Sequence, residues 1–184
     1  TQNISEYKKA EQKLKENFDM VRIAGEKVKL GGWNVILNEN RSYWSDEVAA
    51  IHEMPAGYSP LVEDGINFYA PEWHDRITEV FSRCAKEGIP YDEEMEKITA
   101  TGKQVWVRTM GEAIRDEKGN IFKVQGAFQD ITTRKQIEIE LKNSKARYKA
   151  IFESTGTATL IVDEDTTIFL ANNECLNITG YAPA

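Results

Sequence analysis

The segment from Val105 to Leu141 limits the folds open to this chain more than any other part of the sequence. It begins with an alternating run at residues 105–109, continues through a turn at residues 116–120, and returns along residues 122–129. Two short alternating runs joined by a turn that contains glycine predict a β-hairpin. Asp130-Ile131-Thr132 then leads directly into a polar helical segment. A hairpin that ends in a helix predicts a folded domain joined through that helix to something beyond it.

The length and composition are those of an ordinary globular domain with appendages. The chain has 184 residues, of which 41% are hydrophobic and 29% are charged, and this is enough for one domain of typical size. The sequence contains neither an apolar run of the ~18 residues that a membrane helix needs nor a secretory leader. Because the chain starts with Thr1 rather than Met, we expect it to be a piece of a longer protein.

The charge pattern argues against two classes of partner. The formal net charge is −7, whereas binding to nucleic acid or to an anionic membrane surface depends on clustered Lys and Arg. The lysines here are interleaved with glutamates, which is typical of a solvated helix face. We therefore expect no nucleic acid and no direct membrane contact. Cys84 and Cys175 form no Cys-x-x-Cys motif and fit a reducing, cytoplasmic location, although the full-length protein could be attached to a membrane.

Periodicity and turn residues predict a mixture of helices and antiparallel strands. Pro71 suits the first turn of a helix and Gly88 suits its end, while Gly31-Gly32 is expected to break the first helix. The predicted helices are 5–28, 47–53, one turn within 62–68, 72–86, 133–153 and a short one that ends towards residue 180. The predicted strands are 33–37, 42–44, 91–99, 103–115, 121–131, 158–162 and 168–171.

The two long predicted helices carry apolar residues at alternating three- and four-residue spacing. Heptad-like stripes of this kind are typical of coiled coils, so we predict that the two helices hold subunits together in a homodimer. The residues on these stripes that we expect to meet a partner are Leu14, Phe18 and Val21 in the first helix, and Ile137, Leu141 and Ile151 in the second.

The end of the chain resembles its beginning at a shift of 127 residues. Ile4 falls on Ile131 and Leu14 falls on Leu141, and the predicted order of elements also agrees. Two polar helices can resemble each other through composition alone, but a period this long indicates tandem domains rather than short solenoid repeats. The division that we predict is a linker helix at 1–28, a central domain at 29–132, a connecting helix at 133–154, and the start of a second, incomplete domain at 155–184.

Several short motifs lie at the boundaries of the predicted elements. They are Gly32-Trp33, Trp44-Ser45-Asp46-Glu47, Tyr69-Ala70-Pro71-Glu72, Thr101-Gly102-Lys103, and the run from Gly126 to Thr132. With the order of elements, these motifs resemble a PAS domain followed by its PAC motif, of the subclass common in bacterial and archaeal sensor histidine kinases. The resemblance covers about residues 29–135 fully and 146–184 as an incomplete second copy. It makes the helix at 1–28 the tail of a preceding PAS unit.

The resemblance implies an α+β fold, in which a five-stranded antiparallel sheet has helices on one face and is flanked by N- and C-terminal signalling helices. It also implies a small internal pocket and a regulatory role, but a fold alone does not identify a ligand. The candidate pocket residues are Trp44, Ile51, Ile77, Phe81, Cys84, Trp106 and Phe128.

The junction between the last strand and the exit helix supplies the candidate relay residues Asp130, Thr132 and Thr133. Thr132 or Thr133 can cap the helix by accepting a bond from a free backbone N–H. In the resembling family this junction passes changes in the pocket outward. The alternative is a plain helix cap without a signalling role.

We predict no metal and no cofactor for this chain. Some PAS domains hold haem through a helical histidine, and His74 is the candidate here, but a lone histidine near a helix start is more often a hydrogen-bonded structural residue; His52 has no stronger case. Light-sensing relatives bind flavin through an Asn-Cys-Arg-Phe-Leu-Gln motif, which this sequence lacks, so we interpret Cys84 as a small buried hydrophobe. The four tryptophans could form an aromatic cage for a cationic ligand, although such residues more often pack in a core.

The sequence contains no set of residues that indicates an enzyme. It lacks a nucleotide-binding glycine loop and a Ser-His-Asp order, so a kinase or cyclase is expected to lie outside it as a downstream output domain. Our first hypothesis is a sensory or relay PAS module of a two-component signalling protein, a sensor histidine kinase. A small-molecule ligand or a partner would change the sheet and shift the exit helix. The alternative is a ligand-free module for dimerisation and spacing, with a pocket filled by its own side chains.

Overall fold

The computed structural model describes the backbone of residues 2–180, and the side chains of those residues other than 2–7, 10, 18, 21 and 176. The chain divides into two compact units, residues 1–133 and 134–184. The first unit contains helix α1 (Gln2–Val28), a five-stranded sheet and the helices packed on it. The second contains a two-stranded sheet and a short helix, and helix α5 (Thr132–Glu153) leads into it.

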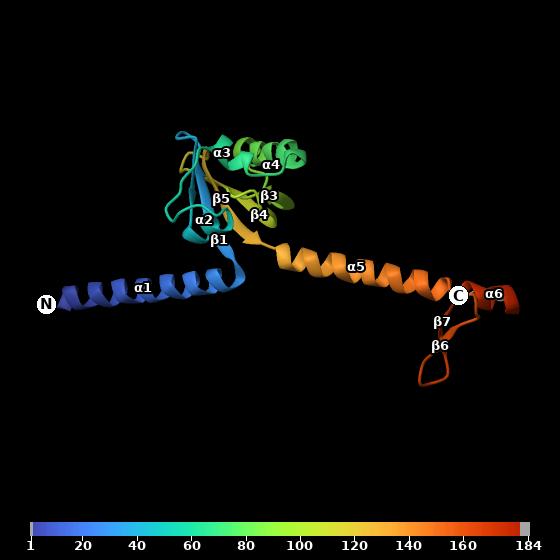
Figure 1. Ribbon diagram of the computed structural model, residues 1–184. Coiled ribbons are helices and arrows are strands. Elements are labelled where there is room, and N and C mark those ends of the chain that lie inside the picture. The colour runs from blue at the N-terminus through green and yellow to red at the C-terminus, as the bar shows by residue number, and fades with distance from the viewer. Residues whose placement is uncertain (1, 181–184) are drawn as a thin grey trace. The chain divides into compact units, whose positions relative to one another are not determined.

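The sheet of the first unit is antiparallel, with the strand order β2-β1-β5-β4-β3 (Figure 1). Its strands are β1 (Leu30–Ile36), β2 (Arg41–Trp44), β3 (Tyr91–Ile98), β4 (Gln104–Arg115) and β5 (Ile121–Asp130). Because β1 and β5 are neighbours, the segment that enters the sheet meets the segment that leaves it. The backbone N–H of Asp130 donates to the carbonyl of Lys29 at 3.0 Å.

Helices cover one face of this sheet (Figure 1). They are α2 (Asp46–Ile51), α3 (Val62–Asn67), the 3-10 helix η1 (Pro71–Trp73) and α4 (His74–Glu87). Ser45 caps α2 by accepting the N–H of Val48, Pro71 opens η1, and Gly88 ends α4 with a left-handed φ of 78°. The predicted α+β fold, with a five-stranded antiparallel sheet and helices on one face, is confirmed.

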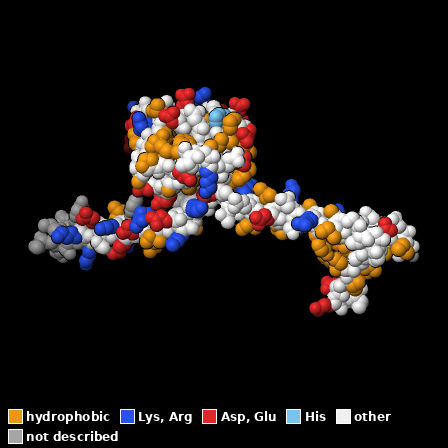
Figure 2. Space-filling model, viewed as in Figure 1, with side chains coloured by type: hydrophobic (Ala, Val, Ile, Leu, Met, Phe, Trp, Pro, Cys, Tyr) orange, Lys and Arg blue, Asp and Glu red, His pale blue; other side chains and the backbone are white. Residues whose placement is uncertain are grey.

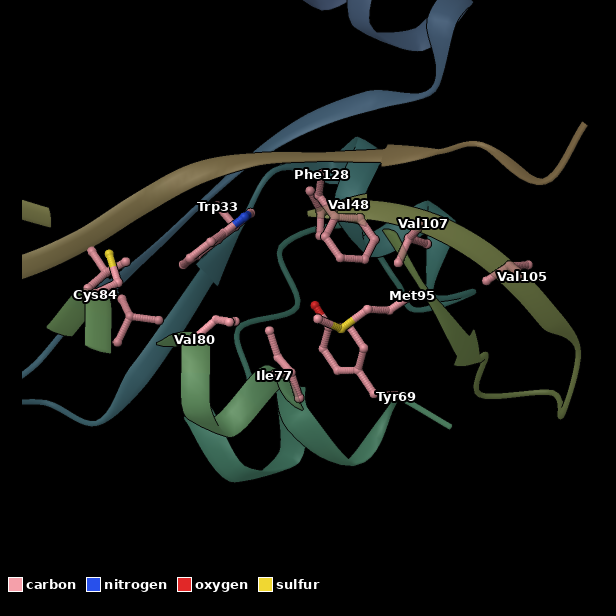
Figure 3. Packing of buried hydrophobic residues seen from close by; sticks show 12 residues of the cluster. Trp33, Val48, Tyr69, Ile77, Val80, Cys84, Met95, Val105, Val107 and Phe128 are labelled. Carbon is pink, nitrogen blue, oxygen red and sulfur yellow. The ribbon is translucent and has the colours of Figure 1, made fainter. Parts of the chain in front are cut away.

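The core of the first unit lies between the sheet and α4 (Figure 3). Ile77, Val80 and Cys84 follow one another at helical spacing on α4 and are buried. On the sheet side they meet inward-facing residues such as Val107 and Phe128, which are also buried. Each apolar side chain of this size contributes roughly 1.5–3 kcal/mol when it is fully buried. This packing fixes α4 over the sheet and thereby sets the walls of the space between them.

The first helix ends in a different way from the one we predicted. Gly31-Gly32 does not break it, because both glycines lie inside β1, and the chain turns earlier, at Lys29, whose φ is 50°. The role of Gly31 is steric. A Cβ at this position would lie 2.5 Å from Oγ of Ser45, so the glycine lets β1 pass close to the beginning of α2.

The apolar stripes of the two long helices are exposed within this chain. Leu14 of α1 is 70% exposed, and Ile137, Leu141 and Ile151 of α5 are each more than half exposed. The side chains of Phe18 and Val21, which we also assigned to the α1 stripe, lie outside the described residues. The homodimer stays a prediction.

The second unit contains β6 (Leu160–Val162), β7 (Ile168–Ala171) and α6 (Asn173–Thr179). Its internal geometry matches part of the first unit at the shift of 127 residues. Asn172 accepts the N–H of Cys175 at the start of α6, as Ser45 accepts the N–H of Val48 at the start of α2. Figure 2 shows that apolar side chains gather on the surface of this unit. The exposed ones include Leu160, Val162, Ile168, Phe169 and Ile178.

Candidate functional site: an interior cavity with a buried lysine

A cavity of about 60 Å³ lies inside the first unit, between the sheet and the helices on it. A single water molecule needs about 10–15 Å³ of such space, so the cavity suits a small ligand. Figure 3 shows Trp33, Tyr69, Ile77 and Phe128 directed towards the space between α4 and the sheet. The lining residues are Trp33, Val35, Ser42, Trp44, Val48, His52, Val62, Gly65, Ile66, Tyr69, Ile77, Phe81, Tyr91, Lys97, Thr109 and Phe128.

Lys97 is the least expected residue of this lining, because it is a lysine with only 2% of its surface exposed. Alternation along β3 places it there: Met95 is buried on the inner face, and Lys97 is two residues further on the same face. Its Nζ lies 4.0 Å from the ring centre of Tyr69 and 4.6 Å from that of Phe128. Aromatic faces at these distances attract a cation.

His52, at the end of α2, is the hydrogen-bond partner of Lys97. The Nζ of Lys97 lies 2.6 Å from Nε2 of His52, and Nδ1 of His52 lies 2.7 Å from the carbonyl oxygen of Val48. A carbonyl oxygen only accepts, so Nδ1 carries the proton and Nε2 accepts the bond from Lys97. The His52 ring also stacks on Trp44, with 4.1 Å between ring centres. Helix α2 therefore fixes both the position and the tautomer of this histidine.

Burial determines which of these groups can carry charge. It lowers the pKa of Lys97 well below the usual range. Burial, followed by the charge of Lys97, lowers the pKa of His52 to about 2, although the bond to Val48 acts in the opposite direction. Burial also raises the pKa of Tyr69 and of Tyr91. His52 and both tyrosines are therefore neutral at pH 7. Among the described residues, no Asp or Glu lines the cavity, so Lys97 is the described lining residue that can hold a charge.

Four of the seven candidate pocket residues lie in the cavity wall. Trp44 comes from β2, Ile77 and Phe81 from α4, and Phe128 from β5. These elements are far apart in the sequence, and the sheet order brings them together. Trp44 is also held by a hydrogen bond from its Nε1 to the hydroxyl of Ser42, at 2.8 Å.

The other three candidates lie elsewhere, and for these our assignment needs correction. Side chains alternate across a strand, so the burial of Val107 on the inner face puts Trp106 on the outer face, where its ring centre is 6.1 Å from that of Trp73. Cys84 is fully buried in the core but does not line the cavity. Ile51 lines a separate hollow beside the end of β5.

Sequence reasoning missed Lys97 and undervalued His52. Lys97 stands in an acidic strand, where alternating charges usually indicate a solvated edge, and its burial follows only from the register with Met95. His52 has no sequence partner that marks it, because Lys97 is 45 residues away. The available signal was the alternation of side chains along a strand. Once Met95 is placed in the core, Lys97, two residues later, must face the same way.

The junction after β5 is a compact hydrogen-bonded unit. A carboxylate oxygen of Asp130 accepts the N–H of Thr132 at 2.8 Å, and the other lies 3.0 Å from Nζ of Lys29. The hydroxyl of Thr132 accepts the N–H of Trp106 at 3.0 Å. Burial pushes the pKa of Asp130 upward, but the bonds from Thr132 and Lys29 outweigh it, so the pKa is lowered.

This arrangement differs from the cap that we predicted. The carboxylate of Asp130, rather than the hydroxyl of Thr132 or Thr133, takes up a free N–H at the start of α5. Thr132 instead ties α5 to β4, and Thr133 is exposed in the first turn. Asp130 also binds Lys29, directly after α1. One carboxylate therefore links the segments that enter and leave the sheet.

The remaining candidates have local structural partners. Nε2 of His74 lies 2.7 Å from the carbonyl oxygen of Tyr69, so this nitrogen donates to the backbone. Within the described residues, no group of three or more His, Cys, Asp or Glu side chains is arranged to hold a metal ion. No described helix is both long and apolar enough to cross a membrane.

Comparison with known proteins identifies the fold of this unit. Residues 41–128 match the family described as PAS fold. These residues form a PAS-fold domain, homologous to PAS domains of sensor kinases and diguanylate cyclases. The chain is 24% identical over 166 residues to sensor protein FixL of Bradyrhizobium diazoefficiens, covering 88% of this chain and 32% of FixL. It is 22% identical over 180 residues to the probable diguanylate cyclase DgcE of Escherichia coli, covering 98% of this chain and 16% of DgcE.

Solved structures show the same fold. A sensory box histidine kinase/response regulator from Burkholderia thailandensis matches with a TM-score of 0.56 and 21% identity, over 71% of this chain and 98% of that one. The N-terminal domain of a diguanylate cyclase with PAS/PAC sensor from Marinobacter aquaeolei matches with a TM-score of 0.54 and 20% identity, over 57% and 97%. By contrast, the chain spans 32% of FixL and 16% of DgcE, and the catalytic domains of these two relatives lie outside the matched region.

Proposed function

We propose that this chain is a sensory or relay PAS module of a multidomain signalling protein, in which a ligand in the interior cavity changes the junction at Asp130 and thereby α5. One observation carries the proposal: the same strand, β5, lines the cavity with Phe128 and ends at Asp130 two residues later. A displacement of Phe128 by a ligand therefore acts on the residue that anchors the start of α5.

The hydrogen bonds around Asp130 support a two-state junction. Its bonds to Thr132 and Lys29 reach the segments on both sides of the sheet, so a shift of β5 would strain or break bonds to both segments. A ligand moves such an equilibrium only by binding the two states with different affinity. Because the cavity wall and the junction share β5, a ligand that fits only one position of Phe128 would favour one state of the junction.

A histidine kinase is the output domain that we infer, located outside this chain in the same polypeptide. The resemblance to PAS units of sensor kinases supports this inference. DgcE, which is named a probable diguanylate cyclase, makes a cyclase the alternative output. We also propose that residues 155–184 are the start of a second PAS unit, because their strands and helix cap match the first unit at a fixed shift of 127 residues.

A ligand-free dimerisation module is the second candidate function. The exposed stripe residues Leu14, Ile137, Leu141 and Ile151 favour it, because a partner helix would bury apolar surface that this chain leaves in water. In that case the cavity would be a packing space, and the sheet would act as a spacer between two coiled coils.

Native mass spectrometry of the purified chain, with an absorbance scan on the same sample, separates the two functions. A sensory module is expected to show a mass above that of the polypeptide, which disappears under denaturing conditions. A bare polypeptide mass in the monomer or dimer, unchanged after incubation with cell extract metabolites, would refute the sensory function and leave the spacer. As a test of the relay, Asp130→Ala in the full-length protein should uncouple input from output, and unchanged signalling would contradict it.

A further inference from the structure

Lys97 lacks the counter-charge that a buried lysine needs. Its side chain is 2% exposed, and it has no ion-pair partner within the described part of the chain. An ammonium group has three N–H donors. One donates to Nε2 of His52, and the side chain makes no other hydrogen bond to a described residue. The aromatic rings of Tyr69 and Phe128 attract the charge but accept no strong hydrogen bond.

Besides Lys97 and His52, the cavity wall carries hydroxyl groups, which can donate to oxygen atoms of negative charge. Tyr69, Tyr91, Thr109 and Ser42 bring hydroxyl groups to the cavity wall, and no Asp or Glu among the described residues lines it. Hydroxyl groups can donate to an anion, whereas a second cation would find no opposite charge. An isolated buried charge is costly until it is paired, so the cavity is electrostatically complementary to a single negative charge.

We infer that the cavity binds the carboxylate of a small organic acid, with one oxygen bonded to Nζ of Lys97. This inference rests on the proposed sensory function and names the ligand class. The volume of about 60 Å³ restricts the acid to a short chain. The apolar walls formed by Ile77, Phe81 and Phe128 take up its hydrocarbon part. Burial lowers the pKa of Lys97 in the empty cavity, and a bound carboxylate restores the charged form.

Calorimetric titration of the full chain with acetate, propionate and butyrate tests the inference, with acetamide, propionamide and butyramide as uncharged counterparts. Sodium chloride keeps the ionic strength constant and reports whether a simple anion suffices. We expect the carboxylates to bind about 10- to 100-fold more tightly than their amides, since the amide oxygen still accepts a hydrogen bond but lacks the charge that strengthens it. This comparison uses the unaltered chain and depends on no variant that could misfold.

Lys97→Met removes the charge and keeps an unbranched side chain of similar length, and Lys118→Met alters an exposed lysine in a turn as the matched control. Carboxylate binding should weaken about 10- to 100-fold in Lys97→Met and stay unchanged in Lys118→Met.

Three results would overturn the inference: equal binding of carboxylates and amides, unaltered carboxylate binding in Lys97→Met, or competition by chloride at equal strength. Binding of amides alone would overturn the ligand class and keep the sensory function. If neither the carboxylates nor the amides bind, the inference is overturned, and native mass spectrometry decides the sensory function separately.

Discussion

Replacing Lys97 by methionine should stabilise the first unit, and the gain should depend on pH in a defined direction. The lysine is 2% exposed, and burial holds its pKa well below the unfolded value of 10.5. Between the folded and the unfolded pKa, the unfolded chain holds a proton that the folded chain has released. The free energy of unfolding of the wild type therefore rises with pH across this window. Below the folded pKa, the penalty of Lys97 is constant and at its largest.

The size of the effect follows from linkage. One pKa unit corresponds to about 1.4 kcal/mol, so the stability difference between Lys97→Met and the wild type should shrink by up to ~1.4 kcal/mol per pH unit as the pH approaches 10. Other titratable side chains on the cavity do not interfere there. The pKa of His52 is lowered to about 2, and those of Tyr69 and Tyr91 are raised. All three are thus neutral in the folded state from pH 7 to pH 10.

Urea unfolding followed by tryptophan fluorescence measures this difference, because all four tryptophans lie between residues 33 and 106, within the first unit. The curves should be recorded from neutral pH to about pH 10 for the wild type, Lys97→Met and the control Lys118→Met, with the m-value compared to verify similar exposure on unfolding. A stability difference that is independent of pH would contradict this prediction, since it would mean that Lys97 keeps an ordinary pKa when it is buried. An equally pH-dependent stability difference between Lys118→Met and the wild type would also contradict it, because Lys118 is exposed.

Three further predictions concern packing, the junction and the helices. Gly31→Ala should lower the free energy of unfolding by about 1–3 kcal/mol, because the added Cβ meets Oγ of Ser45; unchanged urea stability would contradict this. Asp130→Asn should cost about 1.5–3 kcal/mol at neutral pH. The lowered pKa of Asp130 means that this contribution disappears as the pH falls through the folded pKa, so the variant and wild type should converge in acid. Ile137→Glu should reduce self-association in sedimentation, whereas Ile139→Glu, off the stripe, should not; equal effects would exclude a specific helix seam.

Much of the fold was predictable because its signals are local. Pro71 and Gly88 mark the ends of the long helical segment by what their backbones allow, and alternation of side chains marks β4 and β5. The hairpin that ends at Asp130 was also evident from the sequence. Each of these features depends on residues that are close together in the chain.

The parts that could not be predicted depend on which strand face meets the core. Trp106 was assigned to the cavity, but it projects from the other face of β4, and a shift of register by one residue would reverse that outcome. Lys97 lies in an acidic strand, and its inward direction follows only from the burial of Met95 on the same face. Gly31 looked like a helix breaker because a close approach to Ser45 cannot be seen in a sequence. Long-range packing decided all three.

Hydrogen exchange in the first turn of α5 reports whether the cavity is coupled to that helix. The amides of residues 132–136 should be followed in the full chain, with the cavity empty and with it saturated by propionate. We predict a change in their exchange rate on saturation that Asp130→Asn abolishes while propionate still binds. Propionate binding that leaves the exchange of these amides unaltered in the wild type would contradict the claim that the cavity controls the exit helix.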